Sequence, residues 1–178
     1  LWMYNLAGDS VPDKGFQHWL KYKAGQEPVI YNTYHKENSI DNISGVLFNR
    51  GFFESDVRAE EKIKGKKIKL VYTAELNERY SIDTFIYETE KTPPPVPFNN
   101  YKEESLIEKN DPYDIEVLRQ ERSRIAENLR NAGYYYFTDD NLIFKIDSNR
   151  VEKNVSLFIT LKKDIPSRDL KKYRISQI

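Results

Sequence analysis

Alternating apolar residues near the end of the chain predict two adjacent β-strands. Every second residue from 155 to 161 is aliphatic, which is the spacing of a strand with one buried face. We expect this strand to span 154–162 and to pair with another at 142–147 across a polar turn. An earlier stretch at 80–87, rich in β-branched and aromatic residues, predicts a third strand.

A helical period predicts a long helix between the first of these strands and the other two. Asp111 is a suitable N-cap, Pro112 suits the first helical position, and Gly133 suits a left-handed C-terminal cap. The apolar face of this helix is expected to hold Ile115, Leu118, Ile125 and Leu129. Charged residues are expected off that face: Arg119, Glu121, Arg124, Glu127 and Arg130. A stiff proline-rich spacer at 93–97 and a short helical turn at 105–107 precede the helix.

The same order of elements is predicted, in reduced form, in the first half of the chain. Ser39 is expected to cap a shorter helix that Gly51 ends. Residues 57–63 and 67–76 are expected to form a hairpin. The opening strand is either a remnant at 2–6 or a segment upstream of the given sequence.

A short phrase recurs at the end of both predicted helices. Leu47-Phe48-Asn49-Arg50-Gly51-Phe52-Phe53 is matched 82 residues later by Leu129-Arg130-Asn131-Ala132-Gly133-Tyr134-Tyr135. A second echo relates Arg79-Tyr80-Ser81-Ile82 to Lys172-Tyr173-Arg174-Ile175. Because the phrase, the strand pair and the echo recur in one order, the chain is interpreted as copies of one unit. The aromatic residues in the phrase either anchor the helix end to the core or stack on a ligand, and the anchoring interpretation is favoured.

These elements predict an α+β fold of tandem units, each β-α-α-β-β with two helices packed on one face of a three-stranded mixed sheet. The expected domains are 1–78, whose opening strand is missing or degenerate, and 79–165. Residues 166–178 are expected to begin a following repeat. The short link at 75–79 predicts a restricted hinge between the first two repeats.

Composition excludes several functional classes. The 178 residues contain 28 basic and 28 acidic side chains, so the basic excess of a general nucleic-acid binder is lacking. The absence of cysteine excludes disulfides, thiolate nucleophiles and cysteine metal sites. No apolar run in the sequence approaches the ~20 residues of a membrane-spanning helix.

The residue types needed for catalysis do not come together in the sequence. His18 and His35, the only histidines, have no carboxylates at ligand spacing, so surface roles are expected. A glycine-rich phosphate loop and a nucleophile elbow are both missing. The basic run at 62–69 is expected to be a solvated hairpin, with contact to anionic lipid as the alternative. The sequence therefore predicts no enzyme activity, cofactor, metal or small-molecule substrate.

The repeated unit, with its glycine-aromatic stop, resembles the POTRA (polypeptide-transport-associated) domain. Residues 118–137 look like the long helix and GYY stop of POTRA repeats in BamA/TamA-type outer-membrane assembly factors of the bacterial surface antigen family. Residues 25–29 and 49–53 look similar to a preceding repeat. The long proline-rich loop at 93–97 and the unclear opening strand of the first repeat depart from the pattern.

The resemblance implies a periplasmic segment tethered to the outer membrane through a C-terminal membrane β-barrel outside this sequence. Its partners would be unfolded outer-membrane polypeptides or assembly-machinery subunits, bound by strand addition at open sheet edges. The strand after the second helix of each unit is the expected edge, and proline at Val57 or Phe144 is expected to weaken binding. The predicted partner-binding residues are Val57, Arg58, Ala59, Glu60, Leu142, Ile143, Phe144 and Lys145.

Two alternatives remain open at this point. The first is the POTRA region of a two-partner-secretion transporter or of a division protein, and the sequence after Ile178 discriminates between these and an assembly factor. Repeated strands of ~10 residues there would indicate a barrel. The second alternative is an enzyme with an unrecognised site, which a deep polar pocket would favour.

Overall fold

The computed structural model describes residues 6, 12–24, 29–88 and 97–174. By its internal contacts the chain divides into two compact units. The smaller unit combines residues 1–39 with 61–71, and the larger unit combines residues 40–60 with 72–178. The predicted repeats 1–78 and 79–165, and the predicted start of another at 166–178, stay predictions. Residues 2–5 of the predicted remnant strand and most of the proline-rich loop lie outside the described residues.

The residues of the predicted first repeat form helical segments and a β-hairpin. Helix α2 (Phe16–Trp19) continues into a π-helical turn, η1 (Leu20–Ala24). Helix α3 (Thr33–Asn49) is followed by the hairpin of β1 (Asp56–Lys64) and β2 (Lys67–Glu75). None of the residues of α3 is buried. The basic run at 62–69 is exposed along its whole length, as expected for a solvated hairpin.

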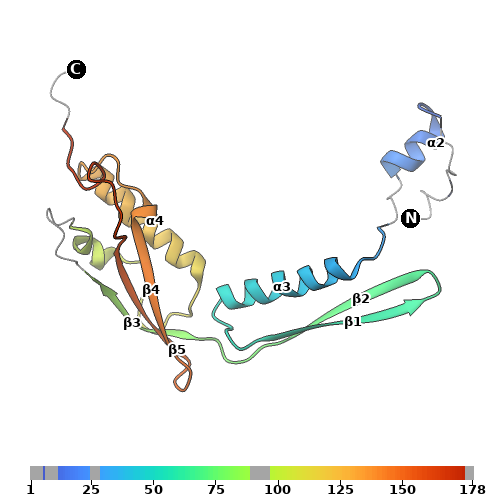
Figure 1. The fold of residues 1–178 in the computed structure, drawn as a ribbon, viewed down its shortest axis with the longest axis horizontal. Helices are drawn as coiled ribbons and strands as arrows, with labels where there is room; N and C mark the ends of the chain where they lie inside the picture. Colours follow the sequence, from blue (N-terminus) through green and yellow to red (C-terminus); the bar gives the residue numbers. More distant parts are fainter. Residues whose placement is uncertain (1–5, 7–11, 25–28, 89–96, 175–178) are drawn as a thin grey trace. The chain divides into compact units, whose positions relative to one another are not determined.

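The residues of the predicted second repeat form a three-stranded mixed sheet with the order β3-β5-β4. Strand β3 (Ser81–Tyr87) runs parallel to the central strand β5 (Asn154–Leu161), and β4 (Leu142–Asn149) runs antiparallel to it. Helix α4 (Ile115–Asn131) lies along this sheet (Figure 1). Two short 3₁₀ helices, η2 (Phe98–Glu104) and η3 (Asp139–Asn141), complete the repeat. The predicted α+β fold with a three-stranded mixed sheet is confirmed.

The core of the larger unit lies between α4 and the sheet. Ile125 and Leu129 of α4 pack with Ile159 and Leu161 of β5 in one apolar cluster. A second cluster joins Leu118 to Val155 and Leu157 of β5, and to Tyr80, Ile82, Ile107 and Tyr113. The alternation predicted for 154–162 is therefore confirmed, because the residues with odd numbers face the helix and are buried.

Three local predictions about helix ends are wrong. Helix α4 begins at Ile115, and its N-cap is Asp114, whose Oδ1 accepts from the Glu116 amide at 2.9 Å. Residues 111–112 lie instead beside β3, where Pro112 forms a bridge with Ser81. Helix α3 begins at Thr33 and not at Ser39, whose hydroxyl donates to the His35 carbonyl. The predicted turn at 105–107 follows η2, which occupies 98–104.

The glycine-aromatic phrases end both long helices as predicted. Gly51 and Gly133 have positive φ values of 86° and 100°, which favour glycine. After Gly133, Tyr134 and Phe137 are buried, whereas Tyr135 and Tyr136 are exposed. The anchoring interpretation is therefore confirmed for Tyr134 and Phe137 and is wrong for the two tyrosines between them.

Gly51 also lies unusually close to the second repeat. A Cβ at Gly51 would meet the Tyr113 carbonyl oxygen at 3.0 Å and the Tyr113 Cβ at 3.1 Å. Gly51→Ala is therefore expected to lower stability by about 1–3 kcal/mol, because it combines positive φ with this contact. Urea denaturation followed by circular dichroism would measure the change.

Gly45 provides the matched control for this substitution. It lies within α3, and a Cβ there meets nothing within 4 Å. Gly45→Ala is therefore expected to be neutral or to stabilise by up to about 1 kcal/mol through helix propensity. Similar effects of the two substitutions would contradict the steric account of Gly51.

Candidate strand-addition edge

Strand β4 forms one edge of the three-stranded sheet, with β5 on its inner side. The predicted residues Leu142, Ile143, Phe144 and Lys145 form its first half. Leu142 is fully buried, and Phe144 is partly buried against both apolar clusters. Ile143 and Lys145 point to the opposite face, where Lys145 Nζ donates to Glu88 Oε2 at 2.8 Å. The structure thus brings these four predicted residues together along one edge.

The backbone direction along β4 follows from its register with β5. Lys162 donates its amide to the Asn141 carbonyl at 2.9 Å, and the register continues as Leu142↔Leu161 and Ile143↔Thr160. Hydrogen-bonded pairs alternate in an antiparallel ladder. Ile143, Lys145 and Asp147 therefore direct their backbone polar groups to β5, and Phe144 and Ile146 direct theirs away from it. Consistent with this alternation, the Leu142 carbonyl accepts from Arg122 Nη1 at 3.3 Å.

The other edge of the sheet is partly covered by the chain itself. The Ile82 amide donates to the Asp111 carbonyl at 2.8 Å, and the Asn110 amide donates to the Ile82 carbonyl at 2.7 Å. The Tyr113 amide likewise donates to the Tyr80 carbonyl at 2.9 Å. The first half of β3 therefore already has a backbone partner on its outer side. This occupation leaves β4 as the more accessible edge for an added strand.

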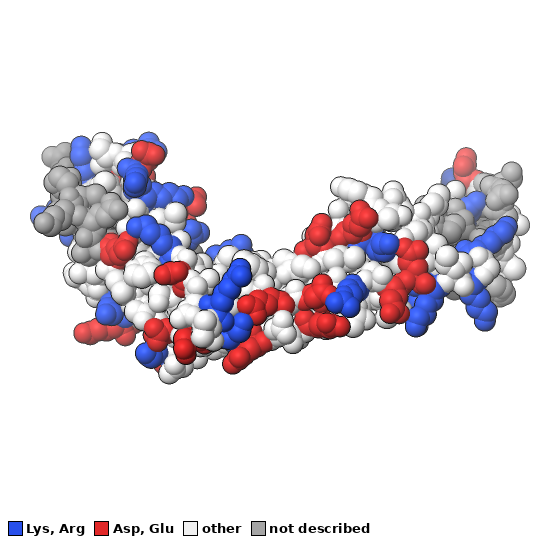
Figure 2. All heavy atoms as spheres, turned by 60° about the horizontal axis from the view of Figure 1, so that its bottom comes forward, with Lys and Arg blue, Asp and Glu red and all other residues white. Residues whose placement is uncertain are grey.

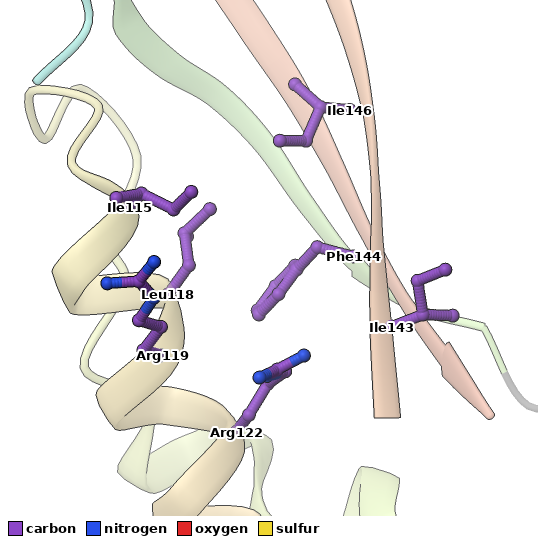
Figure 3. A pocket seen from close by; sticks show the side chains of 7 residues that line it. All are labelled: Ile115, Leu118, Arg119, Arg122, Ile143, Phe144 and Ile146. Atoms are coloured by element: carbon purple, nitrogen blue, oxygen red, sulfur yellow. The ribbon is translucent and has the colours of Figure 1, made fainter. Parts of the chain in front are cut away.

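A cavity of about 350 Å³ lies between α4 and this edge. Its lining residues come from the two elements: Ile115, Leu118, Arg119 and Arg122 from α4, and Ile143, Phe144 and Ile146 from β4. Figure 3 shows Phe144 pointing toward α4 while Ile143 points away from the helix. Ile146 is 44% exposed, although it follows the buried face of its strand. The cavity therefore offers apolar contacts directly beside the outward backbone groups of β4.

The charges around this groove are modest and mixed. Arg119 Nη1 lies 3.3 Å from Glu116 Oε2 in an exposed pair, and Arg122 uses Nη1 for the Leu142 carbonyl. Figure 2 shows acidic and basic side chains interspersed over the face that it draws. A groove of this composition favours apolar side chains, with the two guanidinium groups available for polar groups of an extended partner.

The other predicted edge residues lie on β1 of the two-stranded sheet. Val57 is buried, Ala59 is partly buried, and Glu60 is exposed. Arg58 is exposed and lies 2.5 Å from Asp56 and 3.9 Å from Glu75. Among the described residues β1 pairs with β2 and with no other strand.

The sequence prediction missed the part of the groove that α4 contributes. Ile115, Arg119 and Arg122 recur at steps of four and three, which places them on one side of the helix. Ile146 continues the alternation of Leu142 and Phe144 by two residues. Both signals were present in the spacing, but deducing a groove from them requires knowing that α4 lies beside β4.

The comparisons with known proteins concern structure. No family model and no curated protein matches the sequence. The chain is similar to the crystal structure of BamA from Haemophilus ducreyi lacking POTRA domains 1–3, with a TM-score of 0.45 and 13% identity over 92% of this chain and 27% of that one. It is also similar to BamA POTRA3–5 of Haemophilus influenzae, with a TM-score of 0.42 and 13% identity over 74% of this chain and 48% of that one.

Both neighbours are structures of BamA. This chain spans less than half of either neighbour's length.

Two further findings apply to the described residues only. No group of three or more histidine or acidic side chains there is arranged to hold a metal ion. None of the helices there combines the length and the apolar character needed to cross a membrane.

Proposed function

We propose that this chain is a tandem POTRA-type binding module that accepts an extended segment as an added strand on β4. The observation that carries the proposal is the open edge at Phe144 and Ile146 beside the apolar groove of α4. An added strand would pair with the outward backbone groups of β4, which does not require a particular partner sequence. Every second side chain of that strand would enter the groove.

This binding mode suits partners that share an alternating apolar pattern. Strands of outer-membrane barrels have that pattern over ~10 residues. The proposed partners are therefore unfolded outer-membrane polypeptides, with subunits of an assembly machinery using the same edge or that of β1. The module would work in the periplasm, tethered to the outer membrane by a barrel in the same protein, and would bind without catalysing a reaction. Repeated ~10-residue strands downstream of Ile178 would distinguish this role from that of a division protein.

The edge can be tested at Ile146. Ile146→Pro removes an amide that faces outward, so the β4–β5 ladder is kept while the added strand loses a donor. A fluorescent peptide of ten residues that alternates aliphatic and polar side chains serves as the probe. Ile146→Pro is expected to weaken its binding about tenfold, which corresponds to roughly 1.4 kcal/mol. Fluorescence anisotropy measures the affinity, and circular dichroism checks the fold.

Ile146→Ala is the matched control, because it removes the same side chain but keeps the amide. We expect it to weaken the peptide only two- to threefold, roughly 0.5 kcal/mol for a partly exposed side chain. Equal affinities of the proline and alanine variants would contradict backbone pairing at β4. Phe144→Pro is less suitable than the sequence indicated, since the Phe144 ring also packs 5.8 Å from that of Phe85.

A further inference from the structure

The two glycine-aromatic phrases make the same backbone contact with the tyrosine of the second echo. The Gly51 carbonyl accepts from the Tyr80 amide at 2.9 Å, and the Gly133 carbonyl accepts from the Tyr173 amide at 2.8 Å. A Cβ on either glycine would lie 3.3 Å from the carbonyl oxygen of that tyrosine. Tyr173 is therefore held at Gly133 in the way that Tyr80 is held at Gly51.

The basic residue before each tyrosine repeats its contact as well. The Arg79 guanidinium lies 5.8 Å from the centre of the Phe52 ring. The Lys172 ammonium lies 5.3 Å from the centre of the Tyr134 ring. Phe52 and Tyr134 hold the same position in their phrases. Two independent contacts thus make residues 172–173 the structural counterpart of residues 79–80.

At the first copy, the following repeat covers the second aromatic residue of the phrase. The ring of Phe53 lies 4.7 Å from that of Tyr80 and 5.1 Å from that of Tyr113. Lys153, from the loop between β4 and β5, reaches Glu54 Oε2 at 2.6 Å. Tyr80 and Tyr113 are both buried. The junction therefore needs three elements of the following repeat: its first strand, the approach to its long helix, and its hairpin.

At the second copy, the equivalent face is open. Tyr135, the counterpart of Phe53, is 69% exposed, and Tyr136 and Tyr173 are each 43% exposed. These rings already contact one another, with centre distances of 5.0 Å for Tyr135–Tyr136 and 5.2 Å for Tyr136–Tyr173. Among the described residues, the ring contact recorded for Tyr135 is with its neighbour Tyr136, and none is recorded with a residue from a following unit such as Tyr113 makes with Phe53. The three tyrosines form an aromatic face. This face corresponds to the side of the junction that Phe53 forms at the first copy.

We propose that the aromatic face of Tyr135, Tyr136 and Tyr173 docks a further unit of this same fold, which continues in the same protein after Tyr173. Its approach to the long helix supplies an aromatic ring against Tyr135, as Tyr113 does against Phe53. Tyr136 holds the position after the second copy of the phrase that Glu54 holds after the first, where Glu54 pairs with Lys153. The Arg168 guanidinium lies 5.3 Å from the centre of the Tyr136 ring. The hairpin of the docked unit therefore contacts this position with an apolar group rather than a cation. The inference rests on the proposed tandem organisation and not on strand addition at β4.

Hydroxyl-radical footprinting of the full-length protein and of residues 1–178 tests the proposal. Oxidation of Tyr135 and Tyr136 is expected to be at least fivefold slower in the full-length protein. Tyr34, which is exposed on α3, should react equally in both. Equal reactivity of Tyr135 in the two proteins would overturn the proposal, as would a full-length protein with no folded unit after residue 178.

A dilution series tests whether a second copy of the chain, rather than a following unit, covers the aromatic face. Protection of Tyr135 that appears in residues 1–178 alone and fades on dilution would identify the face as a contact between copies, which would also overturn the proposal. Tyr135→Asp in the full-length protein is expected to expose the segment after Ile178 to protease. Peptide binding at β4 should stay within twofold in that variant, so failure of the docking proposal and failure of strand addition are distinguishable.

Discussion

Arg124→Ala is expected to destabilise the larger compact unit by about 3–5 kcal/mol, because it leaves a buried carboxylate without its charged partner. That carboxylate belongs to Glu121, which is 0% exposed in the middle of α4. Arg124 binds it with two hydrogen bonds, Nε to Oε2 at 2.9 Å and Nη2 to Oε1 at 2.8 Å. Hydrogen exchange of the α4 amides in urea measures the change.

The rest of the Glu121 environment explains why the charge is tolerated. Tyr87 donates its hydroxyl to Oε1 at 2.6 Å, and the Leu106 amide donates to Oε2 at 3.0 Å. Arg124 also donates to the carbonyl of Tyr101, in the middle of η2, at 2.8 Å. The cluster therefore ties β3, the η2 segment and α4 together. Removing one member leaves the others with unsatisfied polar groups, which is more costly than losing one surface contact.

The same cluster predicts a pH dependence. Burial alone would raise the pKa of Glu121, but hydrogen bonds from Arg124, Tyr87 and the Leu106 amide outweigh it and hold this pKa below its ordinary value. The folded pKa is lower than the unfolded value of about 4.3. The contribution is therefore complete above that value and is lost as pH falls through the folded pKa. The stability gap between the natural protein and Arg124→Ala should be largest near neutral pH and narrow below about pH 4.

Arg119→Ala is the control on the same helix. Arg119 pairs with Glu116 three residues away, and both side chains are 60% exposed. Exposed pairs of this kind contribute less than about 1 kcal/mol. If the two arginine variants were equally stable, or if their difference did not change with pH, the buried cluster would not have the proposed role.

Glu121 also shows that, at its position in α4, helical spacing predicts burial better than residue type does. It lies three residues after Leu118 and four before Ile125, so helical spacing alone places it on the buried face. Its charge led to the prediction that it lies off that face, which is wrong because Glu121 is 0% exposed. Its partners Tyr87 and Leu106 come from distant segments, and no local pattern reveals a hydrogen-bond network of that kind.

The same distinction between local sequence pattern and tertiary contact applies to the candidate site at β4. The prediction that the strand at 142–147 is an edge came from the resemblance to POTRA domains, in which the strand after the second helix is expected at the edge. The helix start was predicted wrongly because Asp111 and Pro112 are good capping residues, yet they lie beside β3, where their backbone covers the other edge. The choice of β4 over β3 as the accessible edge therefore depends on a tertiary contact. Local propensity at 111–112 gives no sign of it.

Phe137→Ala is expected to lower stability by about 3–5 kcal/mol, the usual cost of removing a buried aromatic side chain. Phe137 is fully buried in the cluster formed by α4, β4 and β5, and its amide donates to the Tyr134 carbonyl at 2.9 Å. The large loss follows from a cavity at the point where the chain turns from the helix to the sheet. Urea denaturation followed by circular dichroism measures it.

Tyr135→Ala is the control for Phe137→Ala. In residues 1–178 the ring of Tyr135 is mostly exposed, so its removal should change stability by less than about 0.5 kcal/mol. Two aromatic residues two positions apart after Gly133 would then differ several-fold in their contribution to stability. That difference would assign the buried one to anchoring the helix end and leave the exposed one available for docking. A loss of more than about 2 kcal/mol on Tyr135→Ala would show that both rings anchor the core, and the aromatic face would lose its support as a docking surface.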